Sequence, residues 1–239
     1  AAGPRLRTEA EARMRAVQAK YLAAADAWQE IDVAELEKEF FGVAEGYGNI
    51  LGQVDPAEAR AFKATISVLG NTVYKSALTN NLKIDAANRI AKADRELDTA
   101  EAELTMLLKV PGEAGSSINA AAVLSRELSS NILATNNVDY IEANKNRPRE
   151  IFIKALNNAI TDLSSEARAS NPVEFAEKMA RGEMANDHIQ SLYDKLDADE
   201  QLALREIIRK RVSDENAAAE AAFKAQEISL RSDYYKARA

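Results

Sequence analysis

The side chains that most often do chemistry in proteins are scarce in this chain. It has no Cys and a single His, at position 188, in 239 residues. Disulfides and thiolate metal sites are therefore excluded. Glu183 and Asp187 lie close to His188 in the sequence and would be its partners at a metal ion. Metal sites in helical bundles use a Glu-x-x-His pair from each of two helices, so we expect His188 to be a surface or helix-start residue and predict no metal.

A glycine-rich run resembles a phosphate-binding loop at first sight: Gly46-Tyr47-Gly48-Asn49-Ile50-Leu51-Gly52. Such loops follow a strand and open a helix, so that backbone amides face the phosphate. No strand pattern precedes this run, and no Lys-Ser or Lys-Thr pair follows it. We therefore expect a flexible loop or a distorted helix end.

Charged residues form clusters whose chemistry must be weighed. The acidic clusters are Glu35, Glu37 and Glu39, then Asp94, Glu96 and Asp98, then Glu101 and Glu103, and the densest basic cluster is Arg205, Arg209, Lys210 and Arg211. Carboxylate pairs cleave glycosides only in a sugar-binding cleft, so we predict solvent-exposed acidic faces. For the basic cluster we predict pairing with Glu200 and Glu206. The alternative is a contact with phosphate or lipid headgroups.

Composition argues in the same direction. The net charge of −7 and the pI of about 5.1 are opposite to those of a non-specific nucleic-acid binder. The chain has no apolar run of transmembrane length and no signal-peptide pattern. No constellation of nucleophile, acid–base pair or cofactor loop assembles. We predict a protein that is not an enzyme, with no catalytic residues, cofactor or small-molecule substrate.

Helix-start signals and apolar spacing predict helices along nearly the whole chain. A capping box at Thr8-Glu9-Ala10-Glu11 predicts a first helix start, and Asp32 predicts a second. The apolar stripe of the first helix is Met14, Val17, Tyr21, Ala24, Trp28 and Ile31. That of the second is Val33, Leu36, Phe40, Val43, Tyr47 and Ile50.

A much longer helix follows. Asp55-Pro56 is a strong start signal, and no Pro recurs before Pro111, so one helix is predicted over 56–109, roughly 80 Å in length. We expect a bend or break at Gly70 or at Thr79-Asn80-Asn81. The stripes along it are Phe62, Ile66, Leu69, Val73 and Ala77, then Ile90, Ala93, Leu97, Ala100, Leu104 and Leu107.

Shorter helices follow the Pro-Gly linker at 110–117. They are predicted over 118–134, 138–146, 148–168, from Asn171-Pro172 to Arg181-Gly182, over 186–195, and from Asp197 onward. The last carries a sparse stripe: Leu204, Ile208, Val212, Ala219, Phe223, Leu230 and Tyr234. We predict four regions: a helical pair at 1–54, a long helix or helical hairpin at 55–110, a shorter-helix bundle at 111–170, and a helix-turn-helix unit with a long C-terminal helix at 171–239.

The fold class predicted is all-α: long amphipathic helices, then a cluster of shorter ones, as an extended helical bundle. Narrow coiled-coil-like stripes cannot bury a long helix alone, so partner helices must come from this chain or from other subunits. The packing seams we predict are Met14, Val17, Tyr21 and Trp28, and Ile90, Leu97 and Leu104. A membrane-interface anchor is the alternative for the aromatic residues Trp28, Tyr21, Phe40 and Phe41.

The order of motifs after Ser170 resembles the helix-turn-helix units of internal virion proteins, or ejection proteins, of short-tailed bacteriophages. The residues that carry the resemblance are Asn171-Pro172-Val173-Glu174-Phe175-Ala176-Glu177-Lys178-Met179, Arg181-Gly182-Glu183, Leu196-Asp197-Ala198-Asp199-Glu200-Gln201 and the basic residues from Arg205 to Arg211. The long helix, the Pro-Gly linker and the helices around Ile151 to Ile160 are similar too, so the likeness covers residues 55–239.

The resemblance implies a structural protein stored in the virion interior, which is then found in the host envelope or periplasm after ejection. It implies assembly with other copies and with portal, tail or other ejection proteins into a conduit for the genome, and transient contact with the host membrane and the passing DNA. Some members carry a lytic transglycosylase, but its catalytic Glu-Ser region has no match here. No site residue carries over.

A second reading comes from another class of protein. The C-terminal run Leu230-Arg231-Ser232-Asp233-Tyr234-Tyr235-Lys236-Ala237-Arg238 is weakly similar to the helical part of pyocins. The alternative function is therefore a receptor-binding or translocation domain of a bacteriocin. That reading predicts a monomer, whereas the virion reading predicts an assembly.

Overall fold

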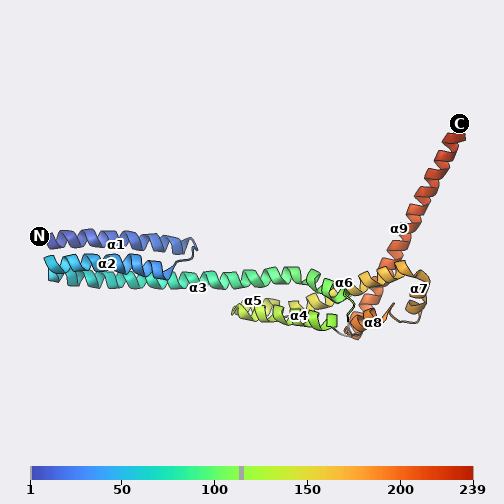
Figure 1. The fold of residues 1–239 in the computed structure, drawn as a ribbon, viewed down its shortest axis with the longest axis horizontal. Helices are drawn as coiled ribbons and strands as arrows, with labels where there is room; N and C mark the ends of the chain where they lie inside the picture. The colour runs from blue at the N-terminus through green and yellow to red at the C-terminus, as the bar shows by residue number, and fades with distance from the viewer. Residues whose placement is uncertain (1, 113–115, 239) are drawn as a thin grey trace. The chain divides into compact units, whose positions relative to one another are not determined.

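The computed structural model describes residues 2–112 and 116–238, and every regular element in that part of the chain is a helix (Figure 1). The helices are α1 (Ala2–Asp26), α2 (Val33–Val54), α3 (Pro56–Lys109), α4 (Ser116–Ala134), α5 (Val138–Asn144), α6 (Arg147–Ser170), α7 (Pro172–Ala180), α8 (Asp187–Tyr193) and α9 (Ala198–Arg238). The prediction of an all-α fold is confirmed.

The chain divides into two compact units, Ala1–Ala91 and Lys92–Ala239, here called unit 1 and unit 2. The long helix α3 contributes its first part to unit 1 and its last part to unit 2. Each unit has its own cluster of buried apolar residues, and the two clusters share none. The units are therefore described one at a time.

Unit 1 packs α1, α2 and the first part of α3 side by side (Figure 1). Its core consists of Ala10, Met14, Tyr21, Ile31, Leu36, Phe40, Ala44, Leu51, Phe62, Ile66, Leu69, Val73 and Ala77. The start predicted at Thr8 is wrong, because α1 begins at Ala2. Thr8 lies inside the helix, and its hydroxyl donates to the carbonyl of Pro4 at 2.9 Å, as Thr side chains do in helix interiors.

Two predicted stripes in unit 1 need correction. Trp28 is 59% exposed, because α1 ends before it and the residue takes a left-handed φ of 57°. The Gln29 amide bonds to the Ala24 carbonyl and the Trp28 amide to that of Ala25, which is a Schellman motif that stops the helix. On α2 the buried face includes Ala44 and Leu51, whereas the predicted Val43 and Ile50 are exposed.

The asparagines at which a break was expected hold the turn between α1 and α2. Asn80 is buried, and its side-chain amide donates to the Gln29 carbonyl at 2.7 Å. Asn81 makes two hydrogen bonds with the backbone of Ile31, at 2.8 and 3.0 Å. The helix α3 runs through Gly70 and both asparagines without interruption, so the predicted break is wrong.

Unit 2 is built around α6, which packs against α4, α7, α8 and α9. Its core draws on the last part of α3 through Leu97, Leu104 and Leu108. The predicted Leu107 is 37% exposed, since the buried stripe has moved one residue toward the C-terminus. The linker predicted at 110–117 falls partly on residues 113–115, which lie outside the described residues.

Capping chemistry starts most of these helices where the sequence indicates. The carboxylates of Asp32 and Asp55 accept backbone amides at the starts of α2 and α3, and the Asn171 side chain does so for α7. Asp197 and Glu200 form a reciprocal capping box at α9, with hydrogen bonds of 2.8 and 2.9 Å. Among the described residues, no helix combines the length and the apolar character that a membrane crossing requires.

Candidate helix-docking interface

The residues that the sequence offered as candidates for chemistry make structural contacts instead. His188 lies in the first turn of α8, and its Nε2 is 2.8 Å from the carbonyl oxygen of Leu108, in the last turn of α3. That contact holds α8 against the end of α3. Within residues 2–112 and 116–238, no three His, Asp or Glu side chains are grouped as metal ligands would be.

The glycine-rich run is regular helix, which corrects the expectation of a loop or distorted end. Gly46, Gly48 and Gly52 lie inside α2, and a Cβ built at any of them meets no atom within 4 Å. No amide of this run is free to face a phosphate, because all of them lie within the helical hydrogen-bonding pattern.

Three residues of the basic cluster at the start of α9, Arg205, Arg209 and Arg211, make polar contacts within unit 2. Arg209 pairs with Glu206 at 2.6 Å, as predicted. Arg205 instead donates to the Tyr193 hydroxyl at 2.6 Å and to the Gly182 carbonyl at 3.2 Å. The other predicted partner, Glu200, pairs with Arg149 of α6 at 3.2 Å.

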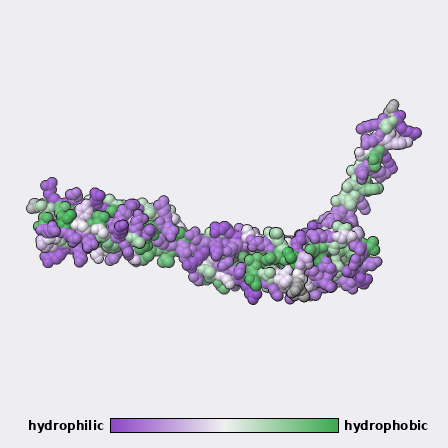
Figure 2. Space-filling model, in the orientation of Figure 1, coloured by the Kyte–Doolittle hydropathy of each residue, from purple (hydrophilic) through white to green (hydrophobic). Residues whose placement is uncertain are grey.

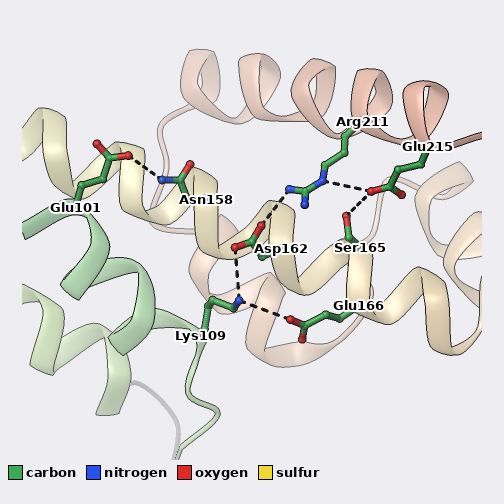
Figure 3. A network of polar contacts seen from close by, with 8 residues as sticks. All are labelled: Glu101, Lys109, Asn158, Asp162, Ser165, Glu166, Arg211 and Glu215. Carbon is green, nitrogen blue, oxygen red and sulfur yellow. Dashed lines mark hydrogen bonds and ion pairs between the residues drawn. The ribbon is translucent and has the colours of Figure 1, made fainter. Parts of the chain in front are cut away.

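A chain of polar contacts crosses from α3 over α6 to α9 (Figure 3). Lys109 of α3 pairs with Asp162 of α6 at 3.5 Å and with Glu166 at 3.6 Å. Asp162 also pairs with Arg211 of α9 at 3.0 Å, and Arg211 with Glu215 at 3.3 Å. One carboxylate therefore bridges two cations from two different helices, which fixes α3 and α9 on either side of α6.

These contacts also give the direction of α9. Arg149 meets Glu200, Asp162 meets Arg211, and Ser165 meets Glu215, so residue numbers rise together along both helices. The helix α9 therefore runs parallel to α6. Because α6 ends at Ser170 and α9 continues to Arg238, α9 extends beyond its neighbour.

Next to this network lies a groove with α6 as its floor and α3 and α9 as its walls, here called the α3–α9 groove. Its volume is about 780 Å³. It is lined by Asp98, Glu101, Ala102, Thr105, Met106 and Lys109 of α3, Asn157, Asn158, Thr161 and Asp162 of α6, and Ile207 and Arg211 of α9. Met106 is 72% exposed and Ile207 46%, so each wall presents an uncovered apolar side chain.

Two residues of α6 that line the groove also carry buried polar atoms without partners. Asn157 Oδ1 and Thr161 Oγ1 are enclosed and make no hydrogen bond within the described residues, and Ser164 Oγ on the same face of α6 makes none either. Thr161 is only 6% exposed. Four other helical threonines, Thr65, Thr72, Thr99 and Thr105, each donate to the carbonyl four residues earlier, whereas Thr161 does not.

Sequence reasoning did not single out these three residues. The available signal was their spacing, since positions 157, 161 and 164 lie on one face of a helix. Three polar residues in a row on a helix that is packed on several sides are unusual, because buried polar groups are nearly always hydrogen-bonded.

The second notable surface is the distal segment of α9, residues 216–238. Arg168, near the end of α6, contacts Glu215 and Asn216. Beyond that point every described residue of α9 is exposed. Figure 2 shows apolar side chains among polar ones along this segment.

One apolar stripe runs the whole length of α9, and only its first part is covered. Leu204 and Ile208 are 0% and 2% exposed, whereas Phe223, Leu230 and Tyr234 are 68%, 64% and 55% exposed. A stripe of this kind normally faces another helix. The distal segment therefore has the pattern of a packed helix but has no partner among the described residues.

No protein-family model, no curated protein and no solved structure matches the chain. The geometry of the groove and of the distal segment is therefore the basis for the function.

Proposed function

We propose that this chain is a non-catalytic structural protein that assembles with further copies of itself, as a segment of a phage internal virion protein that helps to form the genome-delivery conduit across the host envelope. The observation that carries the proposal is the distal segment of α9. It is a helix of 23 residues, by the bounds of α9, with an uncovered apolar stripe.

Physical chemistry supports assembly as the purpose of this segment. Exposed apolar area is unfavourable in water at about 25 cal/mol per Å². An isolated helix gains most of its stability from packing an amphipathic face. A segment that keeps Phe223, Leu230 and Tyr234 on one face is therefore stabilised when another helix covers that face.

The wider role rests on the motif order that resembles ejection proteins. Two properties of the chain are consistent with passage through a narrow tail. It has no disulfide-forming residue. The side chains in its seams are often Ala, so each core buries little apolar area and its unfolding costs less free energy. In this role the partners are other copies, portal and tail proteins, the host membrane and the passing DNA, first in the virion and then in the envelope.

The test is the native mass of the chain over a concentration series, by sedimentation velocity, with and without vesicles of phosphatidylethanolamine and phosphatidylglycerol. We expect the mass to rise with concentration and larger assemblies to form with vesicles, visible as rings or tubes by electron microscopy. A monomer at every concentration, with or without vesicles, contradicts the proposal and favours the bacteriocin-domain alternative.

A further inference from the structure

We propose that unit 1 contains a carbohydrate-binding site at the end of α1, where the ring of Trp28 packs against a neutral sugar and the polar face of α3 binds the sugar's hydroxyls. The site goes beyond the proposed function and does not rest on it, since its residues lie between Ala25 and Lys83, whereas the distal segment of α9 belongs to unit 2. Three observations carry the inference: a tryptophan at a backbone position that suits glycine, a pocket beside it, and a buried side chain with an unpaired oxygen in that pocket.

Trp28 holds a backbone conformation that a bulky residue rarely adopts. Its φ is 57°, at the left-handed position of the Schellman motif that ends α1. The helix α7 ends with the same pair of backbone hydrogen bonds, and there the left-handed residue is Gly182, with φ 77°. Among the described residues, the remaining left-handed position belongs to Asn136. Glycine and asparagine are the usual residues at such positions, because the Cβ of other residues is strained there.

The fold gains little from the Trp28 side chain in return for this strain. A tryptophan stabilises a protein mainly by burying its large ring, but Trp28 is 59% exposed. Glycine at this position would remove the strain and leave less apolar surface in water. Strained backbone positions cluster at ligand-binding and active sites. The ring of Trp28 is therefore better explained by a contact outside the chain than by the packing of unit 1.

Trp28 lines a pocket between the end of α1 and the side of α3, with a volume of about 490 Å³. Pockets that bind small ligands have volumes of about 300–1,000 Å³. The residues that α3 contributes are all polar: Thr72, Lys75, Ser76, Thr79, Asn80 and Lys83. Their spacing places them on one face of the helix, along about 17 Å of its length. The pocket therefore combines one aromatic ring with a row of hydrogen-bonding groups.

Asn80 brings an unpaired oxygen to this pocket. The side chain is only 5% exposed, and its Nδ2 donates to the Gln29 carbonyl at 2.7 Å. Its Oδ1 accepts no hydrogen bond from the described residues, and it is not one of the enclosed unpaired atoms, which all belong to α6. It therefore stays open to the pocket that Asn80 lines. A ligand that reaches this oxygen has to supply a hydrogen-bond donor.

The groups in the pocket call for a ligand that both donates and accepts hydrogen bonds. The ammonium groups of Lys75 and Lys83 only donate, the oxygens of Asp26 and Asn80 accept, and the hydroxyl of Thr79 does both. A sugar hydroxyl also does both. A sugar ring has in addition an apolar face of C–H bonds, which suits the electron-rich face of a tryptophan ring. A sugar therefore matches the aromatic and the polar parts of the pocket together.

The balance of charge favours a neutral ligand over a phosphate or a nucleic acid. The two lysines of the pocket are accompanied by Asp26, and the adjoining turn adds Glu30 and Asp32. This end of unit 1 thus has no excess of positive charge, whereas binding to a phosphate backbone depends on such an excess. A neutral sugar needs none.

The lining also argues against a membrane anchor, which is the alternative for Trp28 from the sequence. A helix that lies at a lipid surface presents a continuous apolar face to it. Apart from Ala25, every residue that lines the pocket with Trp28 is polar or charged. The surroundings of the ring are therefore those of a polar ligand.

The first experiment follows the fluorescence of Trp28, which reports on this site alone because the chain has no other tryptophan. The full chain is titrated with tetrasaccharides of glucose, galactose and N-acetylglucosamine. We expect at least one of them to change the emission in a saturable way. Its affinity should stay constant between about 50 and 200 mM salt, since a neutral ligand displaces no counterions.

Two further probes test the competing ligands under the same conditions: an oligothymidylate, and vesicles of phosphatidylethanolamine and phosphatidylglycerol. Saturable binding of the oligonucleotide that weakens with salt, and no response to sugar, overturns the proposal in favour of a nucleic-acid site. A blue shift with vesicles alone overturns it in favour of a membrane anchor. Emission that ignores every probe overturns it as well.

The second experiment separates binding from folding, with affinity measured by calorimetry. Trp28→Gly should weaken sugar binding about tenfold or more. It should leave the free energy of unfolding unchanged or higher, because glycine adopts the left-handed φ without strain. Ser76→Ala should weaken binding several-fold, whereas Ser129→Ala, at an exposed position on α4, should not change it. A Trp28→Gly chain that binds sugar normally but unfolds more easily would show that the ring serves the fold, and the proposal would be wrong.

Discussion

The two units treat their buried polar side chains in opposite ways. In unit 1, Asn80 is 5% exposed and its amide is bonded to the Gln29 carbonyl, so the group that the helix buries is also the group that holds the α1–α2 turn. In unit 2, Thr161 is 6% exposed and its hydroxyl has no partner. The two side chains are almost equally buried, but Asn80 forms a hydrogen bond that holds its unit together, whereas the Thr161 hydroxyl forms none.

The difference indicates which unit is complete by itself. Unpaired polar groups cost free energy when buried, so the unit that contains them is the less well satisfied of the two. Unit 1 has no such atom among its described residues, whereas unit 2 has three, together with the uncovered distal segment of α9. Unit 2 is therefore where we place the association of copies.

The prediction with the largest expected effect asks whether the two units, which have separate cores, also unfold independently of each other. Phe40→Ala in unit 1 and Leu104→Ala in unit 2 both remove fully buried side chains. We expect losses of about 3–5 and 2–5 kcal/mol in the stability of the affected unit. Native-state hydrogen exchange should show faster exchange in α1 and α2 for the first, and in α6 and α8 for the second.

Val68→Ala, at a side chain that is 66% exposed, is the surface control for the first substitution. If either core substitution accelerates exchange equally in both units, the chain unfolds as one cooperative body and the comparison of two separate units fails.

The next prediction concerns the hydrogen bond that Asn80 donates. Asn80→Ala removes the donor and leaves the buried Gln29 carbonyl without its partner. We expect a loss of about 1–3 kcal/mol, measured by urea unfolding. Asn88→Ala, on an exposed position of the same helix, should change stability little. A loss no greater than that of the control would mean that the clamp on the α1–α2 turn is not structurally important.

Thr161→Val should act in the opposite sense on the isolated chain. The substitution keeps the shape of the side chain and removes the hydroxyl that has no partner. We expect the monomer to be unchanged or stabilised by up to about 1 kcal/mol. Thr99→Val, which deletes a hydroxyl bonded to the Arg95 carbonyl, is the matched control. A clear destabilisation by Thr161→Val would show that the hydroxyl is satisfied within the monomer, and the contrast with Asn80 would disappear.

The smallest expected effect is a dependence on alkaline pH in both units. Burial and the hydrogen bond to Asp94 raise the pKa of Tyr140 in unit 2 to about 12. Burial and the hydrogen bond to Glu39 likewise raise the pKa of Tyr21 in unit 1. The folded state therefore retains these protons at a pH where the unfolded chain releases them.

The sign of the effect follows from linkage. The contribution of each tyrosine is fully present below the unfolded pKa of about 10 and is lost as the pH rises toward the folded value. Urea unfolding at a series of pH values should show falling stability above that point, and Tyr21→Phe and Tyr140→Phe should each reduce the slope. Tyr235→Phe, at an exposed position, is the control. A slope that ignores both substitutions contradicts the assignment.

Local chemistry made much of the fold predictable. Asp32, Asp55, Asn171 and Asp197 start helices where their side chains indicate, because a cap satisfies backbone amides of its own first turn. The long helix was predicted over 56–109 and runs from Pro56 to Lys109. Such features depend on neighbours a few residues away, and those neighbours can be seen in the sequence.

The predictions that failed depended on distant partners. The break expected at Asn80 and Asn81 does not occur, because these side chains find the backbone of residues 29 and 31 and not their own helix. In its second half, the stripe on α2 was placed one residue away from the buried face, or about 100° round the helix, since Val43 and Ile50 have the same apolar character as the buried Leu51. Periodicity alone could not show which apolar residues of α2 pack against the neighbouring helices.

By itself, the sequence determined the all-α class, most helix bounds and the absence of thiol chemistry, because these depend on composition, capping and spacing along the chain. Only the tertiary structure decided that Asn157 and Thr161 share the floor of a groove without hydrogen-bond partners, and that the stripe of α9 is covered at Leu204 and bare at Phe223. The physical reason is that hydrogen-bond satisfaction and burial are properties of neighbours in space. The distal segment is exposed because α6 ends at Ser170 while α9 continues to Arg238. The residues of one helix carry no information about where the other helix ends.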